Sequence, residues 1–526
     1  MRFTPLVMQP IGPSDIEMLN WELRSGTYYG DFRTSALDGD PHFVVDRTQT
    51  AILGSSSIPP PTNFEKTYSF CVADPKQDLA VLVEDEQPSN YVRFHFHSLS
   101  IGQPHKLVEH PVLTVSFDIT FLRENELLDE LISTDPEVMG SYFIVNIKWL
   151  ESDSDISETL LWNWRTGVLL ARIQSEDSTS RHMFLNKDYF LVYSALPEND
   201  HQLARLALLV FRIPKVTLDH KVPPRADFCP SSYPISSPIL ILELPEFHPS
   251  WKITNQRFLL ESGPLPGNIV YTKSATLLCS HVTTLSLSFQ ILLNPNKKPF
   301  YRARKLMDFT VFVNTHQIFA YLGESQSEGV VNRSVPSSEW GTTATRWFVD
   351  DLSIQPYGSQ YILSTEVKSG EAQLVSILNF NTPVIKRHAY ASIATSRPKR
   401  AAANKTQVAA VLEGTGLSAD RLSRTRMSSA KLPLPTLGQE LNHEISTEMA
   451  GGDMKTIIRA GFKDPVVSCL PYRLVTKLQR MPLHGHWWMH GEYLVGFPRR
   501  SSMRDENPPL SLYRLELPHQ TDRSQL

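Results

Sequence analysis

The sequence predicts a mainly β protein: a WD-like β-propeller of seven or eight irregular blades. Its apolar segments are short, and pairs of them recur along the chain, which is typical of hairpins repeated around a centre. Prolines (38) outnumber glycines (24), which favours rigid loops over long helices. The chain has 526 residues, of which 41% are hydrophobic and 20% charged, so a globally disordered protein is excluded.

Strand-like segments share β-branched and aromatic residues and are mostly bounded by Pro, Gly, Asn, Asp or Ser, the marks of strands. In chain order they are Phe43–Val45, Ala80–Val83, Val92–Phe96, Tyr142–Val145, Phe190–Val192, Leu206–Ile213, Ile239–Leu244, Phe309–Val313, Tyr361–Leu363, Leu374–Phe380, Leu494–Phe497 and Leu510–Leu515. Helical windows are few, and the best of them, Glu124–Ser133, is predicted to be a loop helix.

One hairpin is especially clear, LLWNWRTGVLLARI at Leu160–Ile173. Trp162 and Trp164 are two positions apart, so both point to one face of the strand. Gly167 can adopt the positive φ that the turn requires. We interpret this segment as the outer hairpin of a WD-type blade in which Asn163 takes the place of the usual Asp.

A low-complexity segment interrupts the strand pattern at residues 395–452. Between Ser396 and Pro433 eight Lys or Arg residues stand against Glu413 and Asp420. We predict a disordered basic insertion here. The propeller would then comprise residues 1–394 and, closing the ring, 453–526.

Charge and cysteine content limit the partners and the compartment. The net charge of −4 offers no basic excess for nucleic acid or an anionic membrane, and neither is expected as a partner. The four cysteines (Cys71, Cys229, Cys279 and Cys469) are too far apart in sequence for a zinc ribbon or a redox pair. With no signal peptide or transmembrane segment recognisable, a cytoplasmic protein is predicted. Arg397–Arg400 offers a nuclear import signal as the alternative.

Seven landmarks, in common order over most of the chain, resemble the F-box proteins of mushroom-forming fungi, in the propeller-like region that follows their F-box. They are ADPKQDLAVLVE (73–84), SLSIGQPHKL (98–107), LLWNWRTGVLL (160–170), MFLNKDYFLVYS (183–194), SEWGTTATRWF (338–348), LVSILNFNTPVIKR (374–387) and SCLPYRLV (468–475).

This resemblance implies the substrate-binding module of a Skp–cullin–F-box ubiquitin ligase, with a protein substrate and a Skp-type adaptor as partners. The match begins near Trp21–Gly39, and no F-box is visible before it. We expect the F-box to be missing from this sequence or lost. A stand-alone interaction scaffold is the first alternative, and a propeller hydrolase is the second.

The motifs that could carry chemistry are weak, and the predicted protein is not an enzyme and has no catalytic, cofactor-binding or metal-binding residues. His484, His486 and His490 would share one face of a strand, but a metal would also need Glu492 or a distant group. His95 and His97 share a face, interpreted as a polar outer face. Gly414–Ala419 fits a loose dinucleotide pattern without the βαβ unit that this pattern requires.

Two further groups have competing interpretations. Trp340, Arg346 and Trp347 form either a surface recognition patch or, preferably, part of a blade core, in which Gly341 makes a turn. The acidic pairs at 84–86 and 350–351 are interpreted as solvated turn charges.

Overall fold

The structure is a computed structural model. It describes residues 2–9, 16–24, 27–34, 45–53, 59–85, 90–127, 130–149, 156–175, 180–196, 205–215, 227–271, 276–293, 306–328, 332–350, 352, 354–366, 372–387, 445–491, 493–497 and 510–516. Within these ranges the chain forms seven sheets of four or five strands and two small two-stranded sheets, and nearly all strand pairs are antiparallel. The prediction of a mainly β protein is therefore confirmed.

The first three sheets are built almost entirely from consecutive strands. The first sheet contains β2 (Ile16–Arg24), β3 (Thr27–Thr34), β4 (Val45–Ile52) and β5 (Thr62–Tyr68). The second contains β6 (Phe70–Asp74), β7 (Leu79–Glu84), β8 (Tyr91–Ser98), β9 (Val112–Ser116) and the short β17 (Asp227–Phe228). The third contains β10 (Ile132–Met139), β11 (Tyr142–Trp149), β12 (Ser157–Asn163) and β13 (Val168–Ser175).

The next two sheets continue in chain order with one exception. The last strand of the fourth sheet comes from a segment that follows the third strand of the fifth sheet in the chain. The fourth has the order β14 (Ser180–Phe184), β15 (Tyr189–Leu196), β16 (Arg205–Arg212), β18 (Leu240–Glu243) and β24 (Arg333–Val335). The fifth has the order β19 (Trp251–Glu261), β22 (Thr284–Leu293), β23 (Leu306–Asn314) and β25 (Thr345–Phe348).

The last two sheets include the C-terminal strands and one N-terminal strand. The sixth has the order β26 (Ile354–Tyr357), β27 (Gln360–Glu366), β28 (Ala372–Asn379), β32 (Tyr472–Pro482) and β29 (Ile445–Ala450). The seventh has the order β33 (His486–His490), β34 (Tyr493–Phe497), β35 (Leu510–Glu516) and β1 (Arg2–Gln9). β1 runs antiparallel to β35, with Arg2 opposite Glu516.

The remaining elements are short. The small sheets pair β20 (Ile269–Tyr271) with β21 (Thr276–Leu278) and β30 (Thr456–Ile458) with β31 (Val466–Ser468). The labelled helices are α1 (Ile119–Glu124), α2 (Thr315–Glu328), α3 (Ser337–Ala344) and the 3₁₀ turns η1 (Pro75–Gln77) and η2 (Pro230–Ser232), and residues 382–387 are also helical. No helix in the described ranges is long and apolar enough to cross a membrane.

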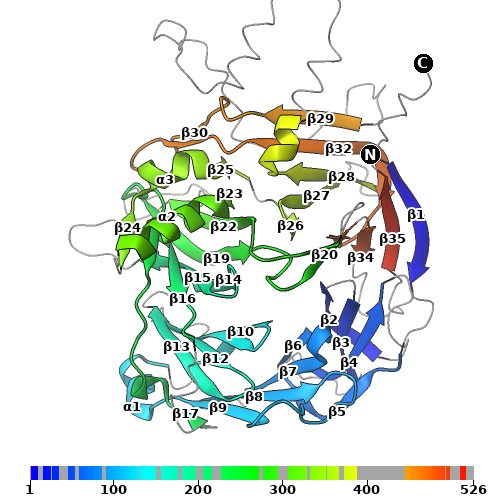
Figure 1. Ribbon diagram of the computed structural model, residues 1–526, viewed down its shortest axis with the longest axis vertical. Coiled ribbons are helices and arrows are strands. Elements are labelled where there is room, and N and C mark those ends of the chain that lie inside the picture. The colour runs from blue at the N-terminus through cyan, green and yellow to red at the C-terminus, as the bar shows by residue number, and fades with distance from the viewer. Residues whose placement is uncertain are drawn as a thin grey trace, which may run out of the picture.

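The sheets follow one another round the molecule in chain order, and the C-terminal strands lie beside the N-terminal ones (Figure 1). Each described core lies between two successive sheets, because a sheet with two apolar faces must bury both. Phe94 and Trp162 pack between the second and third sheets, for example, and Phe312 and Tyr361 pack between the fifth and sixth.

The Leu160–Ile173 hairpin forms as predicted. It comprises β12 and β13, the two strands at one end of the third sheet, and Gly167 has a φ of 68°. Trp162 and Trp164 are fully buried in the same core. The Trp164 indole donates a hydrogen bond to the Gly140 carbonyl (2.7 Å), which fastens the turn to the β10–β11 connection.

Apart from Phe43–Val45, of which only Val45 is described, every predicted strand overlaps an observed strand. The predicted helix at Glu124–Ser133 is wrong. α1 ends at Glu124, and Ile132 already begins β10. The helix begins earlier because the Asp118 side chain caps it, accepting a hydrogen bond from the Thr120 amide (2.7 Å).

The end of the predicted insertion is also misplaced. Residues 388–444 lie outside the described part of the chain, but β29 falls inside the range 395–452 and pairs with β32 along its whole length. The free edge of β32 orders this segment by backbone hydrogen bonding, which composition does not reveal.

Candidate functional site

A cavity of about 440 Å³ lies where the edge strands of six sheets converge. These strands are β6, β10, β14, β19, β26 and β33, and each is the first strand of its own sheet in chain order, except that β1 precedes β33. The lining residues are 70–72, 135–137, 181–183, 260–265, 268, 269, 355–357 and 488–490. The volume is in the range of sites that hold a small molecule or a side chain.

The segment between β19 and β22, which we call the central insertion, contains β20 and β21 and extends toward the middle of the molecule (Figure 1). It is tied to three sheets around the cavity. The Gly358 amide donates to the Gly263 carbonyl, the Val282 amide to Leu185 (2.9 Å), and the Lys76 ammonium to the Asn268 side chain (3.2 Å). The central insertion thus forms one wall of the cavity, and hydrogen bonds attach this wall to several sheets.

Charged groups enter the cavity from the third and fourth sheets. Asp135 and Glu137 are two residues apart on β10, so they share a face. On β14, Arg181 places Nη1 3.8 Å from the Asp135 carboxylate and donates from Nε to the Phe258 carbonyl (3.1 Å). The guanidinium is therefore held against the wall.

Glu261 ends β19 and also lines the cavity. No described residue forms a hydrogen bond or an ion pair with its carboxyl group, and burial raises the pKa of that group to about 7. A carboxyl group in these surroundings can change its ionisation near neutral pH.

Two histidines face the same space. His182 is 8% exposed, and its Nδ1 is buried without a hydrogen-bond partner. The ring of His490 lies edge to face with that of Tyr357, with centroids 6.1 Å apart. Burial lowers the pKa of both histidines, so both are neutral at pH 7. Tyr357, Phe70 and Trp488 add partly exposed aromatic side chains to the wall.

The three histidines of HGHWWMHGE do not converge. The His484 ring packs on Trp487, with centroids 4.4 Å apart, and fills the space beside Gly496. His486 is exposed, whereas His490 lines the cavity. Glu492 lies outside the described residues, and within them no group of three His, Cys, Asp or Glu side chains is placed to hold a metal ion.

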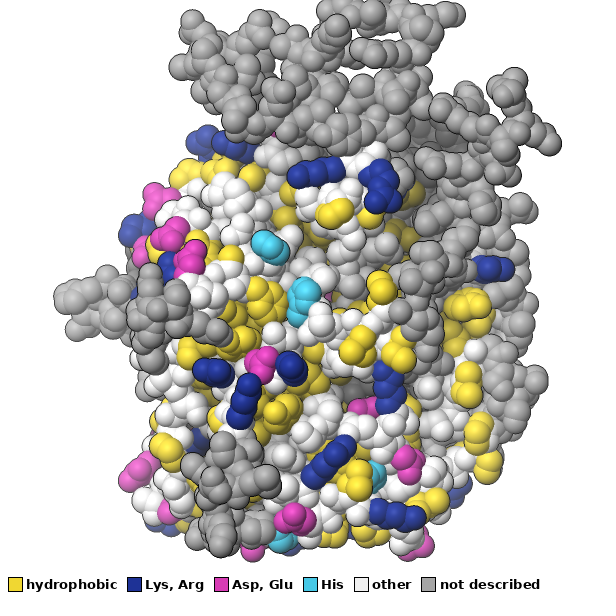
Figure 2. All heavy atoms as spheres, in the orientation of Figure 1, with side chains coloured by type: hydrophobic (Ala, Val, Ile, Leu, Met, Phe, Trp, Pro, Cys, Tyr) yellow, Lys and Arg dark blue, Asp and Glu magenta, His cyan; other side chains and the backbone are white. Residues whose placement is uncertain are grey.

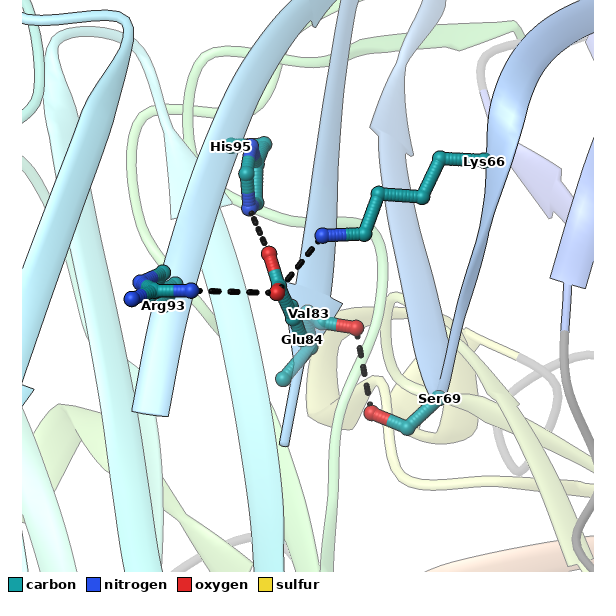
Figure 3. A network of polar contacts seen from close by, with 6 residues as sticks. All are labelled: Lys66, Ser69, Val83, Glu84, Arg93 and His95. Atoms are coloured by element: carbon teal, nitrogen blue, oxygen red, sulfur yellow. Dashed lines mark hydrogen bonds and ion pairs between the residues drawn. The ribbon is translucent and has the colours of Figure 1, made fainter. Parts of the chain in front are cut away.

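Glu84 is not a solvated turn charge, as the sequence had suggested. It is 4% exposed at the end of β7 and contacts Lys66 Nζ (2.6 Å), Arg93 Nη1 (3.2 Å) and His95 Nε2 (2.6 Å) (Figure 3). Burial alone would raise the pKa of Glu84, but the hydrogen bonds and charges of Lys66 and His95 lower it. Because Lys66 belongs to the first sheet, the network ties the first sheet to the second.

His95 and His97 do share one face of β8, with ring centroids 6.2 Å apart. That face is not the polar outer face that was predicted, because both rings contact Tyr68 of the first sheet. His97 Nδ1 lies 2.7 Å from the Gly102 carbonyl oxygen. Each histidine is satisfied within the protein, and the pair serves to pack the two sheets together.

Trp340, Arg346 and Trp347 are buried, which confirms the core interpretation. Gly341, however, lies within α3, not at a turn. Arg346 is fully buried and donates to the carbonyls of Leu470 (2.7 Å) and Met454 (2.9 Å). A second cavity of about 470 Å³ lies beside these tryptophans.

Glu261 and His182 were not among the residues predicted from the sequence. Neither belongs to a motif, and only folding brings the ends of β19 and β14 together. The segments Gly414–Ala419 and Arg397–Arg400 lie outside the described residues, as does Asp351 of the acidic pair.

No protein-family model matches the chain, and no curated protein matches it.

On the face shown in Figure 2, the described Lys and Arg side chains are scattered among acidic and apolar ones, with no large area of one sign.

Proposed function

We propose that the seven sheets are the blades of a closed β-propeller and that the protein is a scaffold that binds another protein. Three features support the propeller: the sheets succeed one another in chain order, cores lie between successive sheets, and β1 joins the seventh sheet. The observation that carries the proposal is the convergence of edge strands from six sheets on one cavity.

A protein partner is favoured by the central insertion. Leu277 and Leu278 on β21 are 55% and 69% exposed. Leu278 pairs with Ile269, which lines the cavity, so this part of the central insertion lies next to the cavity. Exposed apolar groups around a polar cavity are typical of surfaces that contact another macromolecule.

The resemblance to fungal F-box proteins supports a more specific form of this function, a substrate receptor of a Skp–cullin–F-box ubiquitin ligase. A stand-alone scaffold is the alternative. Purification of the tagged full chain from native extract tests both. Recovery of a protein partner together with a Skp-type adaptor supports the receptor, and a partner without the adaptor supports the scaffold. The absence of any specific partner contradicts the binding function.

A propeller hydrolase is the second candidate, favoured by one specific observation. Asp135 and Glu137 of the third sheet and Glu261 of the fifth line the same cavity. A carboxylic acid with a pKa of about 7 suits a general acid, and paired carboxyl groups perform glycoside hydrolysis. A panel of chromogenic glycosides tests this candidate. Turnover that falls at least ~100-fold in Glu261→Gln supports an enzyme, whereas the absence of turnover in the wild type removes it.

A further inference from the structure

We infer that the central cavity binds one basic side chain, a lysine or an arginine, presented by the partner protein, and that Glu261 is the carboxylate that receives it. This assignment rests on the proposed binding function and specifies its partner. The observations that lead to it are the charge of the cavity wall, the unpaired polar groups within it, and its size.

The charge of the wall favours a cation. Three carboxyl groups line the cavity, from Asp135, Glu137 and Glu261, and one guanidinium, from Arg181. Arg181 is already bonded to the Phe258 carbonyl and lies next to Asp135. Low-dielectric walls with an excess of one sign concentrate ions of the opposite sign. The excess of carboxyl groups over guanidinium groups therefore favours a cationic ligand over an anionic one.

Two polar groups of the wall lack partners, and a basic side chain in the cavity would satisfy one of them, the Glu261 carboxyl. The Glu261 carboxyl has no donor among the described residues. His182 is almost fully buried, and its Nδ1 has no hydrogen-bond partner either. Such groups are costly to leave unpaired. An ammonium or guanidinium group carries several N–H donors, which can form charge-assisted hydrogen bonds to a carboxylate.

Size and aromatic content are compatible with a basic side chain. A cavity of about 440 Å³ has room for the stem and head of lysine or arginine. Tyr357 and Trp488 offer aromatic rings to a cation.

The test uses four fluorescent, capped peptide libraries that are identical except at one fixed position, which carries lysine, arginine, norleucine or citrulline. Fluorescence anisotropy with the full chain measures binding. We expect the lysine or the arginine library to bind at least ~10-fold more tightly than its neutral counterpart, since a charge-assisted hydrogen bond contributes that much. Equal binding of charged and neutral libraries would overturn the inference.

Glu261→Gln is the decisive variant, and Glu109→Gln is the matched control, because Glu109 is exposed and does not line the cavity. We expect Glu261→Gln to lose at least ~10-fold in affinity for the charged library and the control to lose nothing. Glutamine has the shape of the protonated carboxyl group, so the variant is expected to fold. Wild-type affinity in Glu261→Gln contradicts the inference.

Calorimetry provides a readout that needs no variant. When a cation binds beside Glu261, the carboxyl group ionises, so at pH 7 binding should release protons, measured as a difference in heat between two buffers of unlike ionisation enthalpy. No release contradicts the role of Glu261. Free butylamine serves as competitor: displacement of the peptide at equal concentration would identify a small amine as the ligand instead of a protein side chain.

The two proposals fail in different ways. If the native-extract purification recovers the same partner with wild-type protein and with Glu261→Gln, the cation site is wrong and the binding function stands. If no partner is recovered and no library binds, both are wrong.

Discussion

Glu84 and Glu261 are both glutamates at the end of a strand, the first buried and the second partly buried, and they differ in their partners. Glu84 contacts Lys66, Arg93 and His95, and Lys66 and His95 lower its pKa although burial opposes them. Glu261 has no such partner among the described residues, and burial raises its pKa. The first carboxylate holds two sheets together, and the second is available for a ligand.

Glu261 makes a prediction about pH. Its folded-state pKa of about 7 exceeds the ordinary value of 4.5, so its contribution favours folding below pH 4.5 and is lost as the pH rises through 7. Glu261→Gln removes this titration. Chemical denaturation should therefore show equal stability of variant and wild type at pH 4.5, with the variant gaining up to about 3 kcal/mol by pH 8. A difference independent of pH would contradict the raised pKa.

Arg346 makes a prediction about stability. Arg346→Met should lower the free energy of unfolding by about 2–5 kcal/mol, because the carbonyls of Leu470 and Met454 lose their donor in a buried place. Arg346 Nη2 is itself buried without a hydrogen-bond partner, so the substitution also removes one unsatisfied donor, which limits the loss. The exposed Arg212→Met is the control, with a change within about 0.5 kcal/mol. Urea titration measures both, and equal effects would show that the buried contacts contribute nothing.

At the scale of elements, the short β30–β31 hairpin is stabilised mainly by contacts with residues outside the hairpin. Phe462, between its two strands, packs against Phe247, Phe309 and Trp347. The preceding Gly461 has a φ of 91°, and its carbonyl accepts a hydrogen bond from the His248 amide (3.0 Å). The hairpin is thus held by the fourth and fifth sheets more than by its own few backbone pairs.

Gly461→Ala tests this packing. A β-carbon at this position would lie 2.5 Å from Ile291 Cδ1 and would also be strained by the positive φ. We expect a loss of about 2–4 kcal/mol in the free energy of unfolding. Gly140→Ala is the matched control, because Gly140 also has a positive φ (57°) but nothing within 4 Å of the added carbon. Equal losses in the two variants would mean that strain alone acts and that the packing is loose.

The positions of strands could be predicted from the sequence, and their roles could not. Segments such as Ala80–Val83 and Phe309–Val313 are apolar on both faces, which identifies buried strands by composition alone. β29 escaped prediction because an edge strand is ordered mainly by its neighbour. Glu84 was misread because burial of a charge depends on partners such as Lys66 from another sheet. Glu261 and His182 line one cavity only because the sheets pack together.

At the scale of the whole molecule, β1 is the N-terminal strand of a sheet otherwise built from the C-terminal end of the chain. Deletion of residues 2–9 should leave one edge of β35 unpaired. We expect a fall of several degrees in the melting temperature and concentration-dependent self-association, because an exposed strand edge pairs with other chains. Calorimetry and light scattering measure the two effects. An unchanged melting temperature and a monomeric variant would contradict a closing role for β1.

The pairing of Arg2 with Glu516 also has a consequence for biosynthesis. While the ribosome is still adding residues, β1 cannot form this pairing until β35 has emerged. Contacts between such distant positions form slowly, and unfinished chains meanwhile expose unpaired strand edges. Chaperone dependence during translation should therefore persist until β35 leaves the exit tunnel.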